Sequence, residues 1–464
     1  MNHLLISAAH KSSGKTTLSI GLCRALSNRK LKVQAFKKGP DYIDPMWLGM
    51  ATGRPCYNLD FNTMSSAEQR TLFAQSGRDA DICLIEGNKG LYDGVDLYGS
   101  NSNAALAKLL RSPVIIVIDT QGMTRGVAPL VLGYQNFDPL VNIAGVILNK
   151  VGGSRHESKL RNVLEHYTSV PVLGAVHRNT ELTLLERHLG LIPSNELAAA
   201  EQHIDTTGRI IAEQVNLDTV LELAQTAPSI TVNTNETQQS SPQKTYPVRI
   251  GIAKDAAFGF YYPDDLRAFE ALGARLLPFS PLKDSKLPPV DGLFLGGGFP
   301  ETHMDMLQHN DAMRTSIKEA IEAGLPVYAE CGGLMYLCRQ LHWENKTCSM
   351  VGALCADTVL EQKPQGRGYV RLKETHKHPW PKLPRAENEI AAHEFHYSKL
   401  INLDPNLEFA YEMQRGTGIN GSNDGIIYKN VLACYTHQRN SNKHPWVERF
   451  LQFVTAQTAP QSRK

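Results

Sequence analysis

Short apolar runs alternate with longer amphipathic stretches through the first half of the chain. The runs are continuous rather than alternating in polarity, which is typical of strands covered on both faces of a parallel sheet. The segments between them are long enough for crossover helices. The pattern therefore predicts an α/β domain built on a parallel sheet. The expected strands are Leu4–Ala8, Val33–Phe36, Ile82–Ile85, Val114–Asp119, Ile143–Leu148 and Val172–Val176.

A polar segment at 226–247 interrupts this pattern, and the pattern then begins again. The segment is rich in Thr, Ser, Gln, Asn and Pro, which is typical of a linker between domains. A long surface loop within one domain is the alternative, but such loops are uncommon. We predict two α/β domains, at 1–225 and 248–455. In the second we expect strands Val248–Ala253, Gly292–Leu295, Pro326–Ala329 and Val431–Tyr435 and helices Pro263–Leu272 and Asp311–Ala323.

Composition and charge narrow the classes of function. The 464 residues are 42% hydrophobic and 20% charged, which argues against extended disorder. Lys and Arg number 48 against 46 Asp and Glu, so no basic face for nucleic acid is expected. No apolar run is long enough to cross a bilayer, no export signal is evident, and the eight cysteines include no C-x-x-C pair. We expect a cytoplasmic protein with reduced thiols, no zinc site, and no nucleic-acid or membrane partner.

A phosphate-binding loop follows the first expected strand. The segment AHKSSGKTT contains Gly14, Lys15, Thr16 and Thr17 and leads into an amphipathic stretch. Glycine allows close approach of the backbone to phosphate, lysine and helix N–H groups neutralise its charge, and the Thr16 hydroxyl is a ligand for Mg²⁺. Ala9 stands where such loops usually have their first glycine, so the match to the motif is incomplete. The strand–loop–helix context nevertheless favours a nucleotide site over a chance match.

Acidic residues follow the second and third expected strands. Asp41 and Asp44 lie in KKGPDYIDP, and Glu86 and Asp93 lie in EGNKGLYDG. Open parallel sheets bind ligands at the carboxyl ends of their strands, and a phosphate loop needs acidic groups to hold its metal. One such carboxylate alone would be interpreted as a solvated side chain on a loop. Four of them near a phosphate loop predict a metal and substrate site.

Two later strand ends carry polar residues whose roles the sequence leaves open. Asp119 either supports a metal ligand or caps a helix. Asn149 either reads an adenine edge through its amide or belongs to a plain turn.

A cysteine lies at an expected strand-to-helix turn in VYAECGGLMYL. Cys331 is followed by Gly332 and Gly333, the cysteine counterpart of a nucleophile elbow. The helix N-terminus is expected to lower the pKa of the thiol, and the Gly332 N–H is expected to face a developing oxyanion. A buried structural cysteine is the alternative, which the flanking glycines disfavour.

A cysteine nucleophile needs a base. His437, which follows the last expected strand, is the best placed, and His393 and His396 are its rivals. No acid for a triad is evident, because Arg439 stands two residues after His437. Glu394 is a candidate for orienting a histidine.

Taken together, these motifs resemble those of the cobyrinic acid a,c-diamide synthase family over nearly the whole chain. The resemblance implies an N-terminal domain similar to dethiobiotin synthetase and other P-loop ATPases of the CobQ/CobB/MinD type. It implies a C-terminal class I glutamine amidotransferase domain. The motifs, in order, are AHKSSGKTT, FKKGPDYIDP, EGNKGLYDG, GVILNKVGG, ERHLGLIP, GGGFPE, ECGGLMYL, HEFHYS and CYTHQ.

The resemblance also implies a reaction. ATP with Mg²⁺ activates the a and c acetates of a tetrapyrrole, and ammonia from L-glutamine converts each to an amide. The expected partners are therefore ATP, L-glutamine and a tetrapyrrole carboxylate, and a homodimer is left open. Implied roles are nucleotide binding for Gly14, Lys15, Thr16, Thr17 and Asn149, Mg²⁺ binding for Thr16, Asp41 and Glu86, productive amidation for Asp93, and nucleophile and base for Cys331 and His437.

One departure bears on the acceptor. Many members of the family read Glu-Gly-Val-Met-Gly where this chain has Asn88 and Lys89 after Glu86-Gly87. Siroheme, hydrogenobyrinate and nickel-sirohydrochlorin are therefore alternatives to cobyrinate as the acceptor. The remaining interpretation is that Asn88 and Lys89 are a neutral variation of the loop. The compact KKGPDYIDP argues against a cobyric acid synthase. The intact ECGG argues against a regulatory P-loop ATPase with a degenerate amidotransferase module.

Overall fold

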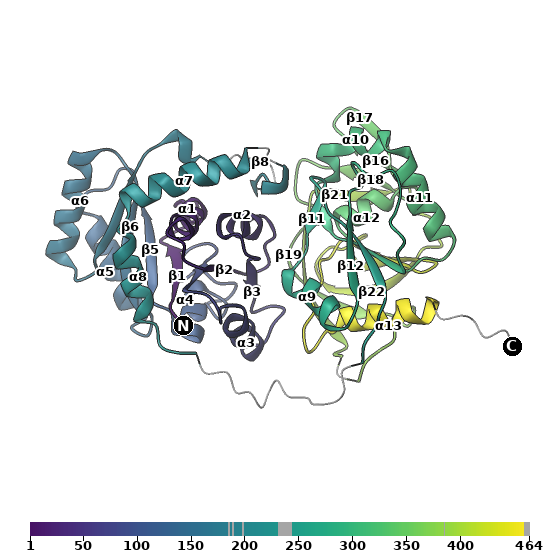
Figure 1. Cartoon of the computed structure of the whole chain (residues 1–464), viewed down its shortest axis with the longest axis horizontal. Coiled ribbons are helices and arrows are strands. Elements are labelled where there is room, and N and C mark those ends of the chain that lie inside the picture. Colours follow the sequence, from purple (N-terminus) through teal and green to yellow (C-terminus); the bar gives the residue numbers. More distant parts are fainter. Residues whose placement is uncertain (184–185, 188–189, 197–198, 231–243, 385, 459–464) are drawn as a thin grey trace. The chain divides into compact units, whose positions relative to one another are not determined.

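The computed structural model describes residues 1–183, 186–187, 190–196, 199–230, 244–384 and 386–458. The chain divides into two compact units, Met1–Gln238 and Gln239–Lys464, and Figure 1 labels many of their elements. Residues 231–243 of the predicted linker and residues 188–189 of the ERHLGLIP motif lie outside the described residues. The predicted domain boundaries therefore stay predictions, and each unit is treated by itself below.

The first unit is built on a seven-stranded sheet in the order β3-β2-β4-β1-β5-β6-β7, with every neighbouring pair parallel. This confirms the predicted parallel α/β fold. All six expected strands are present, and one short strand, β3, was not predicted. The strands are β1 (His3–Ala8), β2 (Val33–Lys38), β3 (Tyr57–Leu59), β4 (Ile82–Glu86), β5 (Val114–Asp119), β6 (Ile143–Val151) and β7 (Val172–His177).

Helices cover both faces of this sheet and form two separate cores. On β1, Leu4 and Ile6 join the core under α1, α2, α7 and α8, whereas Leu5 joins the core under α3, α4, α5 and α6, because successive strand residues face opposite sides. The helices are α1 (Lys15–Asn28), α2 (Ile43–Thr52), α3 (Ser66–Ser76), α4 (Asn103–Leu110), α5 (Val127–Phe137), α6 (Ser154–Tyr167), α7 (Ala200–Gln214) and α8 (Leu217–Gln225). A short hairpin of β8 (Glu186–Arg187) and β9 (Gly190–Leu191) also belongs to this unit.

The second unit holds a nine-stranded mixed sheet in the order β12-β10-β13-β15-β24-β23-β22-β19-β20. Its first five strands are parallel and the rest pair antiparallel. The sheet strands are β10 (Arg249–Ala253), β12 (Arg275–Phe279), β13 (Gly292–Leu295), β15 (Val327–Glu330), β19 (Gly366–Glu374), β20 (Glu389–His396), β22 (Glu408–Arg415), β23 (Asn423–Tyr428) and β24 (Val431–Cys434).

Smaller sheets and the α-helices α9 to α13 complete the described part of this unit. A four-stranded sheet consists of β17 (Lys346–Ser349), β16 (Gln340–Trp343), β18 (Asp357–Leu360) and β21 (Ser398–Ile401), and β11 (Phe258–Phe260) pairs with β14 (Gly297–Gly298). The helices are α9 (Pro263–Ala271), α10 (Met304–His309), α11 (Asp311–Glu322), α12 (Gly332–Leu337) and α13 (Trp446–Thr458).

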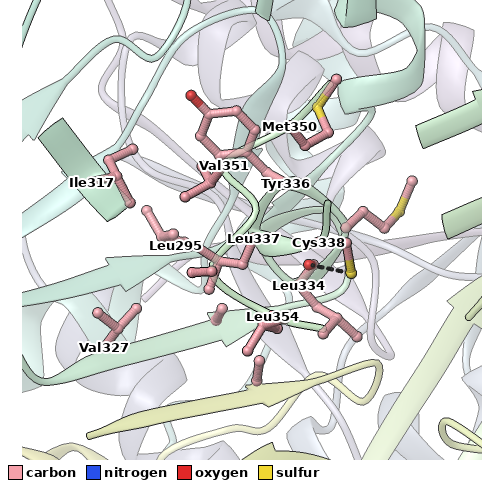
Figure 2. Packing of buried hydrophobic residues seen from close by; sticks show 14 of the residues in the cluster. Leu295, Ile317, Val327, Leu334, Tyr336, Leu337, Cys338, Met350, Val351 and Leu354 are labelled. Carbon is pink, nitrogen blue, oxygen red and sulfur yellow. Dashed lines mark hydrogen bonds between the residues drawn. The ribbon is translucent and has the colours of Figure 1, made fainter. Parts of the chain in front are cut away.

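The short helix α12 is anchored in one of the two cores of this unit. Leu334 and Leu337 are fully buried and pack in one cluster with Leu295, Val327 and Leu354, as Figure 2 shows. Apolar burial stabilises by about 25 cal/mol per Å² of area removed from water. The turn that precedes α12 is therefore held by a rigid strand on one side and a buried helix on the other.

Among the described residues, no helix combines the length and apolarity that a membrane crossing would require.

Candidate active sites

The phosphate loop connects β1 to α1, and its geometry requires glycine at position 14. Gly14 has φ 89°, and a Cβ there would lie 2.2 Å from Nδ2 of Asn149. That amide donates a 2.8 Å hydrogen bond to the Ser13 carbonyl, so Asn149 holds the loop backbone. Lys15 and Thr16 open α1, and Thr17 follows in its first turn. Adenine recognition by Asn149 stays a prediction.

Acidic and basic side chains meet beside Thr16. The Thr16 hydroxyl donates to Oε1 of Glu86 at 2.7 Å and lies 3.3 Å from Oδ2 of Asp44. The ammonium of Lys37 donates to Oε1 of Glu86 at 3.0 Å, pairs with Asp44 and lies 3.7 Å from Oδ2 of Asp41. The structure thus brings together the predicted Thr16, Asp41 and Glu86.

Two members of this cluster carry more contacts than the sequence suggested. Lys37 was not singled out, although the Lys-Lys pair at the end of a strand was a usable signal. Asp44, in the first turn of α2, contacts both Thr16 and Lys37, whereas Asp41 accepts backbone hydrogen bonds from Ile43 and from Asp44 at the helix start.

The electrostatics of the cluster are dominated by burial and by its excess of carboxylates. Burial, reinforced by Asp44, raises the pKa of Asp41 to about 7. Burial also raises the pKa of Glu86, although Lys37 opposes this shift. Burial lowers the pKa of Lys37, but the surrounding carboxylates outweigh it and hold that pKa well above its usual range. Burial lowers the pKa of Lys15.

The donor set fits a hard divalent cation. Oε2 of Glu86 is buried without a hydrogen-bond partner, and the hydroxyl of Thr16 and a carboxylate of Asp44 lie beside its other oxygen. Within the described part of the chain, no three His, Cys, Asp or Glu side chains form a complete metal cage. Mg²⁺ is commonly held by one or two carboxylates together with phosphate oxygens, so its binding at this site stays a prediction.

Asp93 and Asp119 have local roles in this structure. Asp93 accepts a 2.9 Å hydrogen bond from the Gly90 N–H and so closes the loop after β4. Its charge also raises the pKa of Lys15 against the effect of burial. Asp119 forms a 2.7 Å ion pair with Lys150 and accepts from the backbone of Gln121.

In the second unit, Cys331 lies at the turn between β15 and α12. It has φ 46° and ψ −102°, a strained conformation for a residue with a side chain, and its N–H donates to the Cys434 carbonyl at 2.7 Å. A Cβ on Gly332 would lie 2.8 Å from the Gly298 carbonyl oxygen, and one on Gly333 would lie 2.2 Å from that of Leu295. Both glycines are therefore required for this tight turn, as the elbow interpretation predicts.

The net shift of the Cys331 pKa is opposite to the expected lowering. Burial raises this pKa far above its usual range and Glu301 adds to the shift, whereas the Gly332 N–H at the start of α12 lowers it, as expected, but is outweighed. The helix has six residues, so its N-terminal field is weak compared with the cost of burying a thiolate. The free thiol is therefore neutral and needs a base.

The acidic partner of His437 is Glu330. Its Nδ1 lies 3.2 Å from Oε2 of Glu330, while Oε1 of that carboxylate accepts from the Tyr328 hydroxyl at 2.6 Å and from the Gln438 N–H at 2.9 Å. Strands β15 and β24 are parallel neighbours with Glu330 opposite Cys434. The residues that follow them, Cys331 and His437, consequently emerge at the same edge of the sheet.

The other candidates have different partners. His393 stacks on His437 with ring centroids 5.0 Å apart. Glu394 lies 3.6 Å from His396 and accepts two backbone hydrogen bonds from the turn after β22, so its partner is not His437. Glu330 was missed because sequence reasoning sought the acid after the histidine. Arg439, which stands there, pairs with Asp264.

Comparisons with known proteins give the same two-part organisation. A CobQ/CobB/MinD/ParA nucleotide-binding domain matches residues 5–192, and a CobB/CobQ-like glutamine amidotransferase domain matches residues 249–445. The cobyrinate a,c-diamide synthase of Magnetococcus marinus is 46% identical over 96% of this chain and 95% of its own length. That of Methanosarcina acetivorans is 41% identical over 94% and 91%.

The chain belongs to the cobyrinate a,c-diamide synthase family. It is a glutamine-dependent carbon–nitrogen ligase with a nucleotide-binding domain. This family membership removes the support for a regulatory ATPase with a degenerate amidotransferase module. Among solved structures, a GMP synthase subunit from Thermoplasma acidophilum aligns with 45% of this chain and 95% of its own, at 18% identity and a TM-score of 0.33.

Proposed function

We propose that this ligase converts the a and c acetate carboxylates of a tetrapyrrole to amides, with cobyrinate as its acceptor in cobalamin biosynthesis. The observation that carries the proposal is the 46% identity to a named cobyrinate a,c-diamide synthase along 96% of the chain. The two clusters described above supply chemically complementary halves of such a reaction. One releases ammonia from glutamine, and the other activates the acceptor with ATP.

In the glutaminase half, Cys331 is the nucleophile and His437 the base. His437 takes the thiol proton as the sulfur bonds to the side-chain carbonyl carbon of glutamine, and it returns that proton as ammonia leaves. Water then attacks the thioester carbon and gives a proton to His437; the C–S bond breaks, glutamate leaves, and the freed thiolate takes that proton back. The Glu330 carboxylate accepts from Nδ1 of His437, so the other ring nitrogen is available to the sulfur.

In the synthetase half, Lys15 and the loop backbone bind the nucleotide phosphates. The residues that would hold Mg²⁺ are Thr16, Asp44 and Glu86, with Asp41 a predicted further ligand, and the ion would offset charge on the phosphate oxygens. An acceptor carboxylate oxygen attacks the γ-phosphorus, and ADP leaves. Ammonia then attacks the acyl carbon, and phosphate leaves with the C–O bond broken.

The same chemistry on siroheme, hydrogenobyrinate or nickel-sirohydrochlorin is the second candidate. It is favoured by Asn88 and Lys89, where many family members have Val and Met. Asn88 accepts a 2.9 Å hydrogen bond from Lys38, and Lys89 has a positive φ of 38°. Both lie in the loop that follows Glu86.

A panel of acceptors tests the proposal. Purified protein receives ATP, Mg²⁺ and glutamine with each tetrapyrrole in turn, and the products are weighed by mass spectrometry. Each conversion of a carboxyl to an amide lowers the mass by about one unit, because NH₂ replaces OH at the acyl centre. A two-amide shift on cobyrinate is expected. A shift on siroheme alone would keep the mechanism and change the acceptor, and no shift on any tetrapyrrole would contradict the proposal.

A further inference from the structure

Two adjacent lysines at the end of β2 are both buried but differ in their counter-ions. Lys37 lies within 4.0 Å of the carboxylates of Asp41, Asp44 and Glu86. Lys38 is 3% exposed, and its ammonium has no carboxylate within that distance among the described residues. Its polar contact is a 2.9 Å hydrogen bond to Oδ1 of Asn88.

A buried ammonium that no carboxylate contacts is costly, because it loses hydration and gains only a longer-range attraction in return. Burial lowers the pKa of Lys38 to about 8; the charge of Asp60 opposes this shift, and Lys89 and Lys37 add to it. The amide oxygen of Asn88 accepts one hydrogen bond from the ammonium but carries no negative charge.

Asn88 is itself held in place by neighbouring groups. The buried Asn103 accepts from the Asn88 N–H at 3.1 Å and donates to the carbonyls on either side of Lys89. A Cβ on Gly39 would lie 3.1 Å from Nδ2 of Asn88, so the side chain is packed against the turn after β2. Lys38 and Asn88 therefore form a pre-positioned pair rather than two mobile surface groups.

The position of this pair separates it from the phosphate loop. Successive strand residues such as Lys37 and Lys38 point to opposite faces of a sheet. Lys37 contacts Asp44 and Glu86, the two carboxylates beside Thr16. Lys38 instead contacts the loop after β4 through Asn88. Lys38 and Asn88 therefore lie outside the cluster around Thr16 and Lys37.

We propose that Lys38 and Asn88 form a subsite that binds a carboxylate of the tetrapyrrole acceptor other than the one being amidated. This inference rests on the proposed function. A tetrapyrrole of this class carries several acetate and propionate side chains, so recognition of a second carboxylate orients the macrocycle while the first reacts. A nucleotide phosphate is the other source of an anionic oxygen, and the experiment separates the two.

The test compares Lys38→Met and Asn88→Val with Lys159→Met, a control that removes an exposed lysine from α6. Ammonium chloride replaces glutamine, so that only the synthetase half is measured. Loss of a hydrogen-bonded charge predicts a rise of about tenfold or more in the KM for cobyrinate with Lys38→Met, with the KM for ATP nearly unchanged. Asn88→Val should give a smaller rise, and Lys159→Met should stay within about twofold of wild type.

Thermal unfolding of the same variants separates binding from folding. Removing a buried charge that no carboxylate contacts is expected to leave the Tm of Lys38→Met equal to or above that of wild type. An unchanged KM for the acceptor would overturn the inference, and a rise in the KM for ATP alone would assign Lys38 to the nucleotide instead. If wild-type protein amidates none of the tetrapyrroles, the proposed function fails and this subsite falls with it.

Discussion

The candidate site of the unit Met1–Gln238 contains several charged side chains in contact. The candidate nucleophile of the unit Gln239–Lys464, Cys331, is neutral instead. Lys37 is surrounded by three carboxylates, which hold its pKa high. Cys331 is buried where its thiolate is disfavoured. The first site is prepared for a substrate that already carries charge, and the second must create its charge during the reaction.

The largest expected effect comes from the charged site. Glu86→Gln removes a carboxylate that contacts both Thr16 and Lys37. We expect amidation driven by ammonium chloride to fall by about 10³-fold, because phosphoryl transfer depends on such positioned charge. Glu165→Gln, on the exposed side of α6, is the control and should retain activity. Near-normal amidation by Glu86→Gln would remove this residue from the site.

The next effect concerns the acid partner of His437. Glu330→Gln should lower kcat for glutamine hydrolysis by about 10²- to 10³-fold with little change in KM, because the imidazole loses the carboxylate that orients it and stabilises its charged form. The matched control is Glu394→Gln, a buried carboxylate whose contacts are with His396 and two backbone N–H groups.

A conservative variant makes this test specific. If Glu330 acts through His437, Glu330→Asp should recover part of the kcat that Glu330→Gln loses, because it restores a carboxylate beside Nδ1 of the imidazole. An equally low kcat in Glu330→Asp would mean that Glu330 supports only the fold of the turn.

The neutrality of Cys331 gives a third prediction. In a Cys355→Ser background, which removes the exposed cysteine, alkylation of Cys331 by iodoacetamide should be slow at neutral pH. Its rate should keep rising with pH beyond the range of an ordinary thiol, because burial raises the pKa of Cys331. A rate that reaches a plateau near pH 7 would show a preformed thiolate and contradict the contrast between the two sites.

Most of the fold could be predicted because the central strands are continuous apolar runs. Val114–Asp119 and Gly292–Leu295 begin and end where the sequence places them. The antiparallel strands that extend the sheet beyond β24 were not predicted, since strands such as Gly366–Glu374 mix buried and exposed positions without a regular alternation. Such strands are stabilised by their neighbours more than by their own pattern.

The candidate sites were predictable in their motifs and less so in their partners. The sequence does not distinguish the roles of Asp41 and Asp44. In the structure Asp44, in the first turn of α2, pairs with Lys37, whereas Asp41 lies just before the helix and accepts a hydrogen bond from the Ile43 N–H. Glu330 contacts His437 only because β15 and β24 are neighbours. That pairing is long-range, and no local spacing reveals it.

The smallest expected effect is on stability. The pKa of Asp41 is about 7 in the folded protein, above its ordinary value of 3.8, so its contribution to stability is lost as pH rises from about 4 through 7. Asp41→Asn should therefore raise the Tm at pH 8 without Mg²⁺ and leave it unchanged at pH 4. The side chain is 31% exposed, so we expect a gain of only about 1 kcal/mol. A fall in Tm at pH 8 would contradict this electrostatic account.

Amide formation with two nitrogen sources tests most directly the claim that the two sites carry separate halves of one reaction. Cys331→Ala and Lys15→Met are each supplied with ATP, Mg²⁺ and the acceptor, and with either glutamine or ammonium chloride. The account predicts that Cys331→Ala loses only the glutamine-driven reaction, and that Lys15→Met loses both. Failure of ammonium to restore amidation by Cys331→Ala, or full activity of Lys15→Met, would contradict it.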